Sequence, residues 1–371
     1  MFHTIQNWER GEPKRHEYWT FRDGLWWPVE VHGSTEPPGQ ETHRNFQFSV
    51  LAWNIDFMRS FDDARMSAAL SHLNELTRGP FPALILLNEM TKGDLKLIKA
   101  AEWIRERYNI TDANTDHWES PSYGTTILVP RALPIKDVFR VHYARTSMQR
   151  DALFVDLALP DEFTLRICTS HLESLRSSPP KRPAQLATAA KYLHQAYAGI
   201  IGGDFNAIEE FDKTLHVENN LKDAYLEVGW EEGHEDGMTW GHMAQKDQRE
   251  RFGFSRMDKI MFCGRVRLVG FGRFGLDIVV EDEEIAKQLM EVAGLEKAWV
   301  TDHLGVRAEF RMEMPESPGS GGGGNVAGGE EEVEEKKEGP SGSEEDGTGA
   351  GETGEEANDG AGQLLTPPST S

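Results

Sequence analysis

Residues 200–207 read Ile200-Ile201-Gly202-Gly203-Asp204-Phe205-Asn206-Ala207, and the rest of the chain is best interpreted from this stretch. The apolar run has no helical period and ends in two glycines, which predicts a buried strand that leaves its sheet sharply. On an extended chain Asp204 and Asn206 project to the same side, where they could hold a water or a phosphate oxygen beside a metal ion. An ordinary strand-to-turn exit uses the same residue types.

The composition divides the 371 residues into three parts. Residues 1–45 are polar with an aromatic cluster around Asp23-Gly24, which predicts a short hairpin packing on a larger body. Residues 46–312 carry the apolar runs of a folded domain. Residues 313–371 hold 15 acidic residues against 2 lysines and so supply −13 of the net charge of −23. We predict that this Gly- and Glu-rich tail is disordered, because it has too little apolar surface to bury.

Charge and cysteine usage limit the function classes. An acidic chain is a poor non-specific duplex binder, although a local basic cleft stays open. Cys168 and Cys263 lie in apolar runs, which predicts reduced core thiols of an intracellular protein, nuclear or cytoplasmic. No stretch has the length of a membrane span and no signal-peptide pattern is present, so we expect no contact with membranes. We also expect a monomer.

The order of apolar runs predicts a layered body. We expect strands near 46–53, 83–87, 123–129, 138–143, 152–159, 165–170, 200–203, 257–262 and 299–303. We expect one helix with Met66 to Leu76 on its buried face, one from about Asp94 to Tyr108, and one from Pro183 to a stop at Gly199. Strands alternating with a few helices and hairpins imply an α/β or α+β body with sheets sandwiched between helices.

Polar side chains recur at or near the ends of six of these apolar runs. They are Asn54 and Asp56, Glu89, His171 and Ser174, Asp204 and Asn206, Asp258, and Asp302 and His303. If the ends share one edge of the sheets, these groups meet in one cleft. Oxygen ligands without thiolates suit Mg²⁺ or Mn²⁺, and two histidines with carboxylates suit phosphate contact and proton transfer. The set matches metal-assisted attack of water on a phosphorus ester. Turn acids and structural histidines are the ordinary alternative, and His117, His142, His216, His234 and His242 are interpreted as surface or loop residues.

The ordered series resembles the endonuclease/exonuclease/phosphatase superfamily over about residues 46–312. It consists of Trp53-Asn54-Ile55-Asp56, Leu87-Asn88-Glu89, Ser170-His171-Leu172-Glu173-Ser174, Gly203-Asp204-Phe205-Asn206, Arg256-Met257-Asp258 and Thr301-Asp302-His303. The resemblance implies an α+β fold, a four-layered α/β sandwich in which two mixed β-sheets pack face to face with helices outside. It also implies hydrolysis of phosphodiesters or phosphomonoesters with a divalent metal, Mg²⁺ or Mn²⁺.

The resemblance also implies roles for individual residues. Glu89 is the principal metal ligand, with Asn54 and Asp302 near the metal and Asp56 supporting the same site. Asp204 orients and deprotonates the attacking water, and Asn206 positions this water and the phosphate. His171 donates to a non-bridging phosphate oxygen. His303, oriented by Asp258, stabilises the pentavalent transition state or passes a proton.

The segment His171-Leu172-Glu173-Ser174 most resembles the 5′-tyrosyl-DNA phosphodiesterase (type 2) branch, which implies Ser174, Trp240 and Arg150 as substrate-binding residues and DNA with a 5′ protein adduct as the substrate. Departures from the branch are Phe57 after the aspartate, Phe205 for a small polar residue, Thr301 for a serine, and no arginine after Asn206-Ala207-Ile208. We expect Phe205 to lie where the substrate is selected. The alternatives are another nuclease of the superfamily, a small-molecule phosphatase, or a non-catalytic scaffold that binds through its acidic tail.

Overall fold

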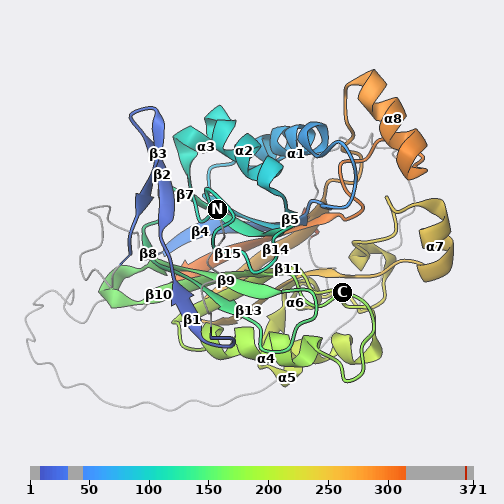
Figure 1. Ribbon diagram of the computed structural model, residues 1–371. Coiled ribbons are helices and arrows are strands. Elements are labelled where there is room, and N and C mark those ends of the chain that lie inside the picture. The colour runs from blue at the N-terminus through green and yellow to red at the C-terminus, as the bar shows by residue number, and fades with distance from the viewer. Residues whose placement is uncertain (1–8, 32–44, 315–363, 366–371) are drawn as a thin grey trace, which may run out of the picture. The chain divides into compact units, whose positions relative to one another are not determined.

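The computed structural model describes residues 9–31, 45–314 and 364–365 (Figure 1). The disorder predicted for the tail therefore falls almost wholly outside the described residues. The strands of the described part form two sheets.

The first sheet contains residues from both halves of the chain. Its seven described strands lie in the order β1 (Pro13–Arg15), β8 (Ile135–His142), β9 (Asp151–Ala158), β10 (Thr164–Ser170), β11 (Ala198–Asp204), β13 (Asp258–Gly264) and β12 (Lys222–Asp223). The second sheet has nine described strands in the order β16 (Leu364–Leu365), β14 (Val266–Phe274), β15 (Gly305–Glu313), β4 (Asn45–Asn54), β5 (Ala83–Met90), β7 (Gly124–Pro130), β6 (Tyr108–Ile110), β2 (Tyr18–Arg22) and β3 (Leu25–Val29). The hairpin predicted around Asp23-Gly24 is confirmed as β2 and β3.

Helices cover the outer faces of both sheets. In Figure 1, α1 (Asp62–Leu76), α2 (Lys92–Ala100) and α3 (Glu102–Arg107) lie on one side of the strands, and α4 (Arg182–Leu193) and α5 (Leu215–Glu218) on the other. The other helices in the described part of the chain are α6 (Ala224–Glu227), α7 (Lys246–Phe252), α8 (Glu283–Ala293) and three short 3₁₀ turns, η1 (Pro160–Glu162), η2 (Glu210–Lys213) and η3 (Glu235–Gly237).

Alternating side chains of the strands divide the core into layers. In β4, Val50 and Ala52 face an apolar cluster shared by both sheets, whereas Leu51 and Trp53 pack with α1 and α2. A third cluster joins the other face of the seven-stranded sheet to α4 and α5. Such two-sided burial explains why these strands read as continuous apolar runs. The predicted four-layered α+β sandwich is confirmed.

Two predicted helices end earlier than expected. The helix placed at Asp94–Tyr108 is two helices, because Ala101 has an extended backbone (ψ 119°). The Lys99 carbonyl at this break accepts hydrogen bonds from Arg105 and Trp26, contacts that a helical period does not contain. The helix predicted to stop at Gly199 ends at Leu193 instead, and Gly199 lies inside β11. A Cβ at Gly199 would come within 2.9 Å of the Leu193 Cβ, so close packing of the helix end explains this glycine.

The strand predicted at 299–303 is wrong. These residues make isolated bridges, and the strand that follows, β15, begins at Gly305. The polar groups still reach the expected edge, because β15 runs antiparallel to β4 and begins where β4 ends. In the same way Asp258 begins β13 directly opposite Asp204, the last residue of β11.

A candidate active site where the two sheets meet

Asp204 joins the polar ends of both sheets. Its Oδ2 accepts a hydrogen bond from Asn54 Nδ2 at 3.0 Å, and its backbone N–H donates to Asn88 Oδ1 at 2.8 Å. Asn54 ends β4 and pairs with Asn88, two residues before the end of the parallel strand β5, whereas Asp204 ends β11 of the other sheet. The sequence analysis named Asn88 in the motif Leu87-Asn88-Glu89 but gave it no role. An uncharged polar residue directly after an apolar run needs a hydrogen-bond partner when it is buried, as Asn88 is, and this could have marked it as a site residue.

Gly203 permits this approach. Its φ is +148°, and a Cβ there would lie 2.2 Å from the Ser170 carbonyl oxygen and 2.6 Å from Asn88 Oδ1. Beyond it, Asp204 Oδ1 accepts a hydrogen bond from the backbone of Asn206 at 2.8 Å, which turns the chain with a φ of 47° at Asn206. The side-chain amide of Asn206 donates to the Leu172 carbonyl at 3.1 Å. The backbone from Gly203 to Asn206 therefore fixes the position of the Asp204 carboxylate.

His171 lies between Asp204 and an arginine. Its Nε2 is 3.3 Å from Asp204 Oδ2 and 3.7 Å from Glu89 Oε1, and Arg150 contacts its Nδ1. Arg150 also donates to Ser174 Oγ at 3.0 Å. Burial, together with the Arg150 charge, lowers the pKa of His171 to about 4, so the ring is neutral near pH 7. Since Arg150 donates to Nδ1, the ring proton is assigned to Nε2, which faces the two carboxylates.

His303 is the second histidine near Asp204. Its Nδ1 is 2.7 Å from Asp258 Oδ2, while its Nε2 lies 3.8 Å from Asp204 Oδ2 and 3.9 Å from Asp302 Oδ1. Burial acts to lower the pKa of His303, but the Asp258, Asp204 and Asp302 carboxylates together raise it well above its usual value. His303 is therefore a cation that Asp258 orients. Burial alone would raise the pKa of Asp204, yet the His303 charge and the His171 contact hold it below the ordinary range.

Three further carboxylates lie close enough to perturb one another. Burial, followed by the charges of Asp56 and Asp302, raises the pKa of Glu89 to about 7. Burial and Asp302 likewise raise the pKa of Asp56 to about 6, although Arg59 forms an ion pair with it at 2.9 Å. Trp240 Nε1 donates to Asp302 Oδ2 at 2.9 Å. These carboxylates are buried or, for Glu89 and Asp302, at most one-fifth exposed, and they repel one another. A hard divalent cation stabilises such surroundings, so this oxygen set fits Mg²⁺ or Mn²⁺.

The backbone at this set is strained. Asp56 and Glu89 have φ angles of 59° and 56°, in the left-handed region that few non-glycine residues adopt. The Phe57 N–H donates to Glu89 Oε2 at 3.1 Å, and the Met58 N–H donates to Asp56 Oδ1 at 3.1 Å. Such strain recurs at sites where the surrounding structure fixes a functional geometry. Within the described residues, the twelve predicted site residues are thus linked by direct contacts or by charge effects at the same end of the sheets.

Phe205 does not lie where the sequence analysis placed it. Its side chain is 3% exposed and packs in the apolar cluster with Leu172 and Leu186, because alternation directs it away from Asp204 and Asn206. The prediction that Phe205 selects the substrate is therefore wrong. His142, interpreted as a surface or loop residue, is also buried, at 5% exposure.

An aromatic pair beside His171 was missed. Phe57 packs against Tyr123 with ring centroids 4.5 Å apart and ring planes tilted by 33°, and the Arg150 guanidinium carbon lies 4.8 Å from the centre of the Tyr123 ring. Tyr123 stood in a predicted strand and carried no motif, so only the fold brings it to the site.

Comparisons with known proteins agree with this geometry. Residues 51–303 match the model of the Endonuclease/Exonuclease/phosphatase family. The 5′-tyrosyl-DNA phosphodiesterase of Caenorhabditis elegans is 23% identical over 239 residues, covering 62% of each chain. Tyrosyl-DNA phosphodiesterase 2 of Rattus norvegicus is 28% identical over 53% of this chain and 51% of its own. The chain thus spans between half and two thirds of these two relatives.

Solved structures share the fold. Truncated C. elegans TDP2 superimposes with a TM-score of 0.54 at 20% identity, covering 71% of this chain and 97% of its own. The D. rerio TDP2 complexed with a single-strand DNA product superimposes with a TM-score of 0.56 at 17% identity, covering 71% of this chain and 98% of its own. Among the described residues, none of the helices is long and apolar enough to cross a membrane.

Proposed function

The chain belongs to the endonuclease/exonuclease/phosphatase family, and we propose that it is a divalent-metal-dependent phosphodiesterase that hydrolyses the bond between a tyrosine and a DNA 5′ end. The observation that carries this proposal is the convergence of Asn54, His171 and His303 on the single carboxylate of Asp204. Catalysis is assigned to residues 46–312. The sequence prediction of an intracellular monomer, nuclear or cytoplasmic, belongs to the same proposal.

The DNA-adduct substrate is supported by the relatives and by the residues around His171. Two curated relatives are named as tyrosyl-DNA phosphodiesterases, and one similar structure holds a single-strand DNA product. In this chain Arg150 contacts His171, Ser174 and the face of Tyr123. A fixed guanidinium beside an aromatic face suits a phosphate that carries an aromatic leaving group.

Glu89 would hold the metal, with Asn54 and Asp302 near it and Asp56 supporting the same site. When bound, Mg²⁺ or Mn²⁺ would polarise the phosphate and offset the negative charge that develops on it. The raised pKa of Glu89 is consistent with this role, because a carboxylate crowded by Asp56 and Asp302 gains most from a neighbouring cation.

Asp204 and Asn206 would hold the attacking water. The low pKa of Asp204 means that it is ionised at neutral pH and is a weak proton acceptor. It therefore acts more by orienting the water through a hydrogen bond than by removing its proton, which narrows the role expected from the resemblance. Neutral His171 can donate its Nε2 proton to a phosphate oxygen, and cationic His303, oriented by Asp258, can stabilise charge in the transition state.

A second candidate, a phosphatase for a small phosphorylated molecule, is favoured by one observation. A cavity of about 220 Å³ is lined by Ala207 and Lys259, the residues that follow Asn206 and Asp258. The cations of its lining, Lys213, Arg256 and Lys259, are each near a carboxylate such as Glu210 or Glu232. This wall therefore offers less uncompensated positive charge to a nucleic-acid backbone than a typical binding groove.

Three substrates assayed with Mg²⁺ separate these functions: a 5′-phosphotyrosyl oligonucleotide, an abasic duplex and a simple aryl phosphodiester. We expect turnover of the first to exceed the other two. Turnover of only the abasic duplex or only the aryl diester would reject the tyrosyl-DNA assignment while keeping hydrolysis. If none is cleaved and Asp204→Asn behaves as wild type, the chain is not a hydrolase of this kind.

A further inference from the structure

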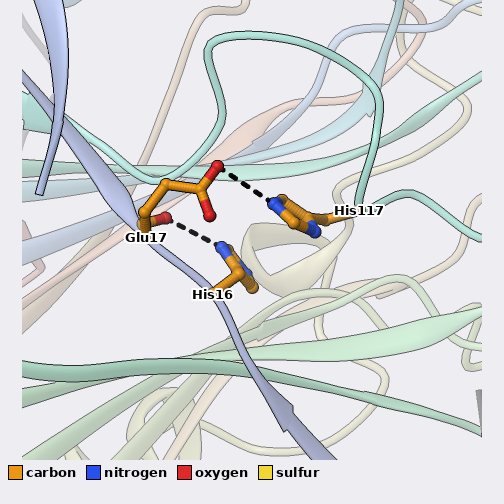
Figure 2. A group of neighbouring side chains, drawn as sticks. All are labelled: His16, Glu17 and His117. Atoms are coloured by element: carbon orange, nitrogen blue, oxygen red, sulfur yellow. Dashed lines mark hydrogen bonds and ion pairs between the residues drawn. The ribbon is translucent and has the colours of Figure 1, made fainter. Parts of the chain in front are cut away.

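A second cluster of metal-ligating side chains lies outside the candidate active site. It consists of His16, Glu17 and His117, and one ring nitrogen of each histidine and a carboxylate oxygen of Glu17 all lie within 4.8 Å of one another. His16 and Glu17 connect β1 of one sheet to β2 of the other, and His117 belongs to the loop between β6 and β7. Figure 2 shows this N-terminal segment and the loop meeting through the three side chains.

Among the described residues, one ring nitrogen of His16 has a hydrogen-bond partner and the other has none. Its Nδ1 lies 2.9 Å from the backbone oxygen of Glu17, so this nitrogen carries the proton and donates it. Its Nε2 is buried and has no hydrogen-bond partner among the described residues. The side chain is 6% exposed, and burial lowers its pKa to about 4, so the ring stays neutral at physiological pH. Histidines that bind metals usually donate the opposite N–H to such a carbonyl, which fixes the ring and leaves the other lone pair for the ion.

Glu17 and His117 are as far apart as two ligands of one metal ion. Glu17 Oε1 lies 3.3 Å from His117 Nε2 (Figure 2). Ligands about 2.0–2.2 Å from a tetrahedral Zn²⁺ are about 3.3–3.6 Å from each other. We propose that His16, Glu17 and His117 bind a divalent transition-metal ion, for which Zn²⁺ is the best match, with water as the remaining ligand. Two imidazoles and one carboxylate favour Zn²⁺ over Mg²⁺, which prefers an all-oxygen set.

Binding requires one ring to turn. The His16 and His117 rings are stacked, with centroids 4.3 Å apart and planes 18° from parallel. Because the nitrogen lone pairs lie in the ring planes, stacked rings do not direct them at a common point. His117 is the ring that can rotate, since it lies on a loop and its side chain is 18% exposed, and Glu17 beside it is 28% exposed. These exposures also give an ion access from solvent.

The proposed ion would cross-link three parts of the chain. It would connect the segment that crosses between the two sheets to the 111–123 loop, which ends at Tyr123 beside Arg150. This site is independent of the proposed hydrolysis, because none of its residues contacts phosphate, water or metal in that scheme. We therefore expect Zn²⁺ to raise the thermal midpoint by several degrees without serving as the catalytic metal.

Titration of the full-length protein with Zn²⁺ and Co²⁺ tests the proposal, with millimolar Mg²⁺ present to occupy the oxygen-ligand site. Calorimetry gives the number of Zn²⁺ sites, and Co²⁺ absorption reports low-coordinate imidazole ligation. Glu89→Gln serves as the variant altered only at the candidate active site. His117→Asn keeps a polar side chain of similar size, and Glu17→Gln keeps a hydrogen-bonding partner for His117.

We expect wild type and Glu89→Gln to bind one Zn²⁺ with the same affinity and to show the Co²⁺ band. We expect His117→Asn and Glu17→Gln to weaken this binding at least tenfold and to lose the thermal shift, while far-UV circular dichroism stays unchanged. The proposal is overturned if both variants bind as wild type does, or if the only Zn²⁺ site is lost in Glu89→Gln.

Discussion

Asn54 at the end of β4 donates its side-chain amide to Asp204 at the end of β11, 3.0 Å away and in the other sheet. The same Asp204 oxygen lies 3.3 Å from His171 and 3.8 Å from His303. One carboxylate oxygen therefore faces an amide, a neutral imidazole and a cationic imidazole. Each of these groups loses a partner if that oxygen becomes a nitrogen, so substitution of Asp204 is the most direct test of the site.

We expect Asp204→Asn to lower kcat on a cleaved phosphodiester by about 10²–10⁴-fold, since it removes the charge that holds the water and pairs with His303. Single-turnover kinetics at saturating substrate measure the loss. The exposed Asp277, whose side chain is 69% accessible, provides the matched control Asp277→Asn, which should keep full activity. A fall of less than tenfold in Asp204→Asn, with its fold intact, would contradict the assigned role.

We expect Asp258→Asn to move the basic limb of the pH profile to lower pH. Burial acts to lower the pKa of His303, and the Asp258 carboxylate is the largest of the charges that raise it. If the cationic form is the active one, activity is present below this pKa and is lost as the pH rises through it. Removing the Asp258 charge lowers the pKa, so the loss begins earlier. Measurement of kcat/KM against pH in both proteins checks this, and a uniform drop without a shifted limb would argue against a cationic His303.

The sequence was sufficient to predict the fold class and the site residues that lie at or just after the ends of strands. Asp204, Glu89 and His171 could be found because polar groups directly after buried apolar runs are conspicuous. Their convergence follows from parallel pairing of β4 with β5 and of β10 with β11. Asp258 begins β13 and His303 lies just before β15. Both reach the same edge because β13 and β15 run antiparallel to neighbours that end there.

Features that depend on contacts distant in sequence could not be predicted. The helix break at Ala101 is stabilised by Trp26, which is 73 residues from its partner Lys99. Tyr123 carries no motif and reaches Arg150 only through the fold. The burial of Phe205 was open to prediction, because alternation from Asp204 and Asn206 requires it to face the other side of the strand.

We expect native Cys168 and Cys263 to resist thiol reagents at pH 8. Burial raises the pKa of Cys263 to about 11 and that of Cys168 well above its usual value, and the thiolate is the reactive form. At pH 8 a thiol of pKa 11 is ionised to about one part in a thousand. Reaction with an aromatic disulfide reagent should be slow in the native protein and complete after unfolding. Val292→Cys, at a position 70% exposed, gives the fast positive control; comparable labelling of the native cysteines would contradict their burial.

We expect Gly203→Ala to reduce the free energy of unfolding by about 2–3 kcal/mol, since a left-handed non-glycine residue and a backbone clash are combined there. The added Cβ would lie 2.2 Å from the Ser170 carbonyl oxygen, a backbone atom that cannot rotate away. Urea denaturation measures the change. Gly79→Ala is the control, because a Cβ there meets nothing within 4 Å, and it should have little effect. Equal stability of the two variants would show that the strand exit relaxes freely.

We expect Glu89→Gln to have opposite effects on metal binding and on stability. Without the Glu89 charge the site should bind Mn²⁺ at least about tenfold more weakly, as measured by electron paramagnetic resonance, and the activity should fall as the metal affinity falls.

In EDTA, by contrast, the substitution should favour stability at neutral pH. The pKa of Glu89 is raised to about 7, chiefly by burial and then by Asp56 and Asp302. A carboxyl with a raised native pKa stabilises the fold below its unfolded pKa, and this stability is lost as the pH rises toward 7. The metal-free variant should therefore lose less stability than wild type between about pH 4.5 and 8. If chelator does not affect wild-type activity, or if the variant is the less stable protein at pH 8, Glu89 is a structural acid and not a metal ligand.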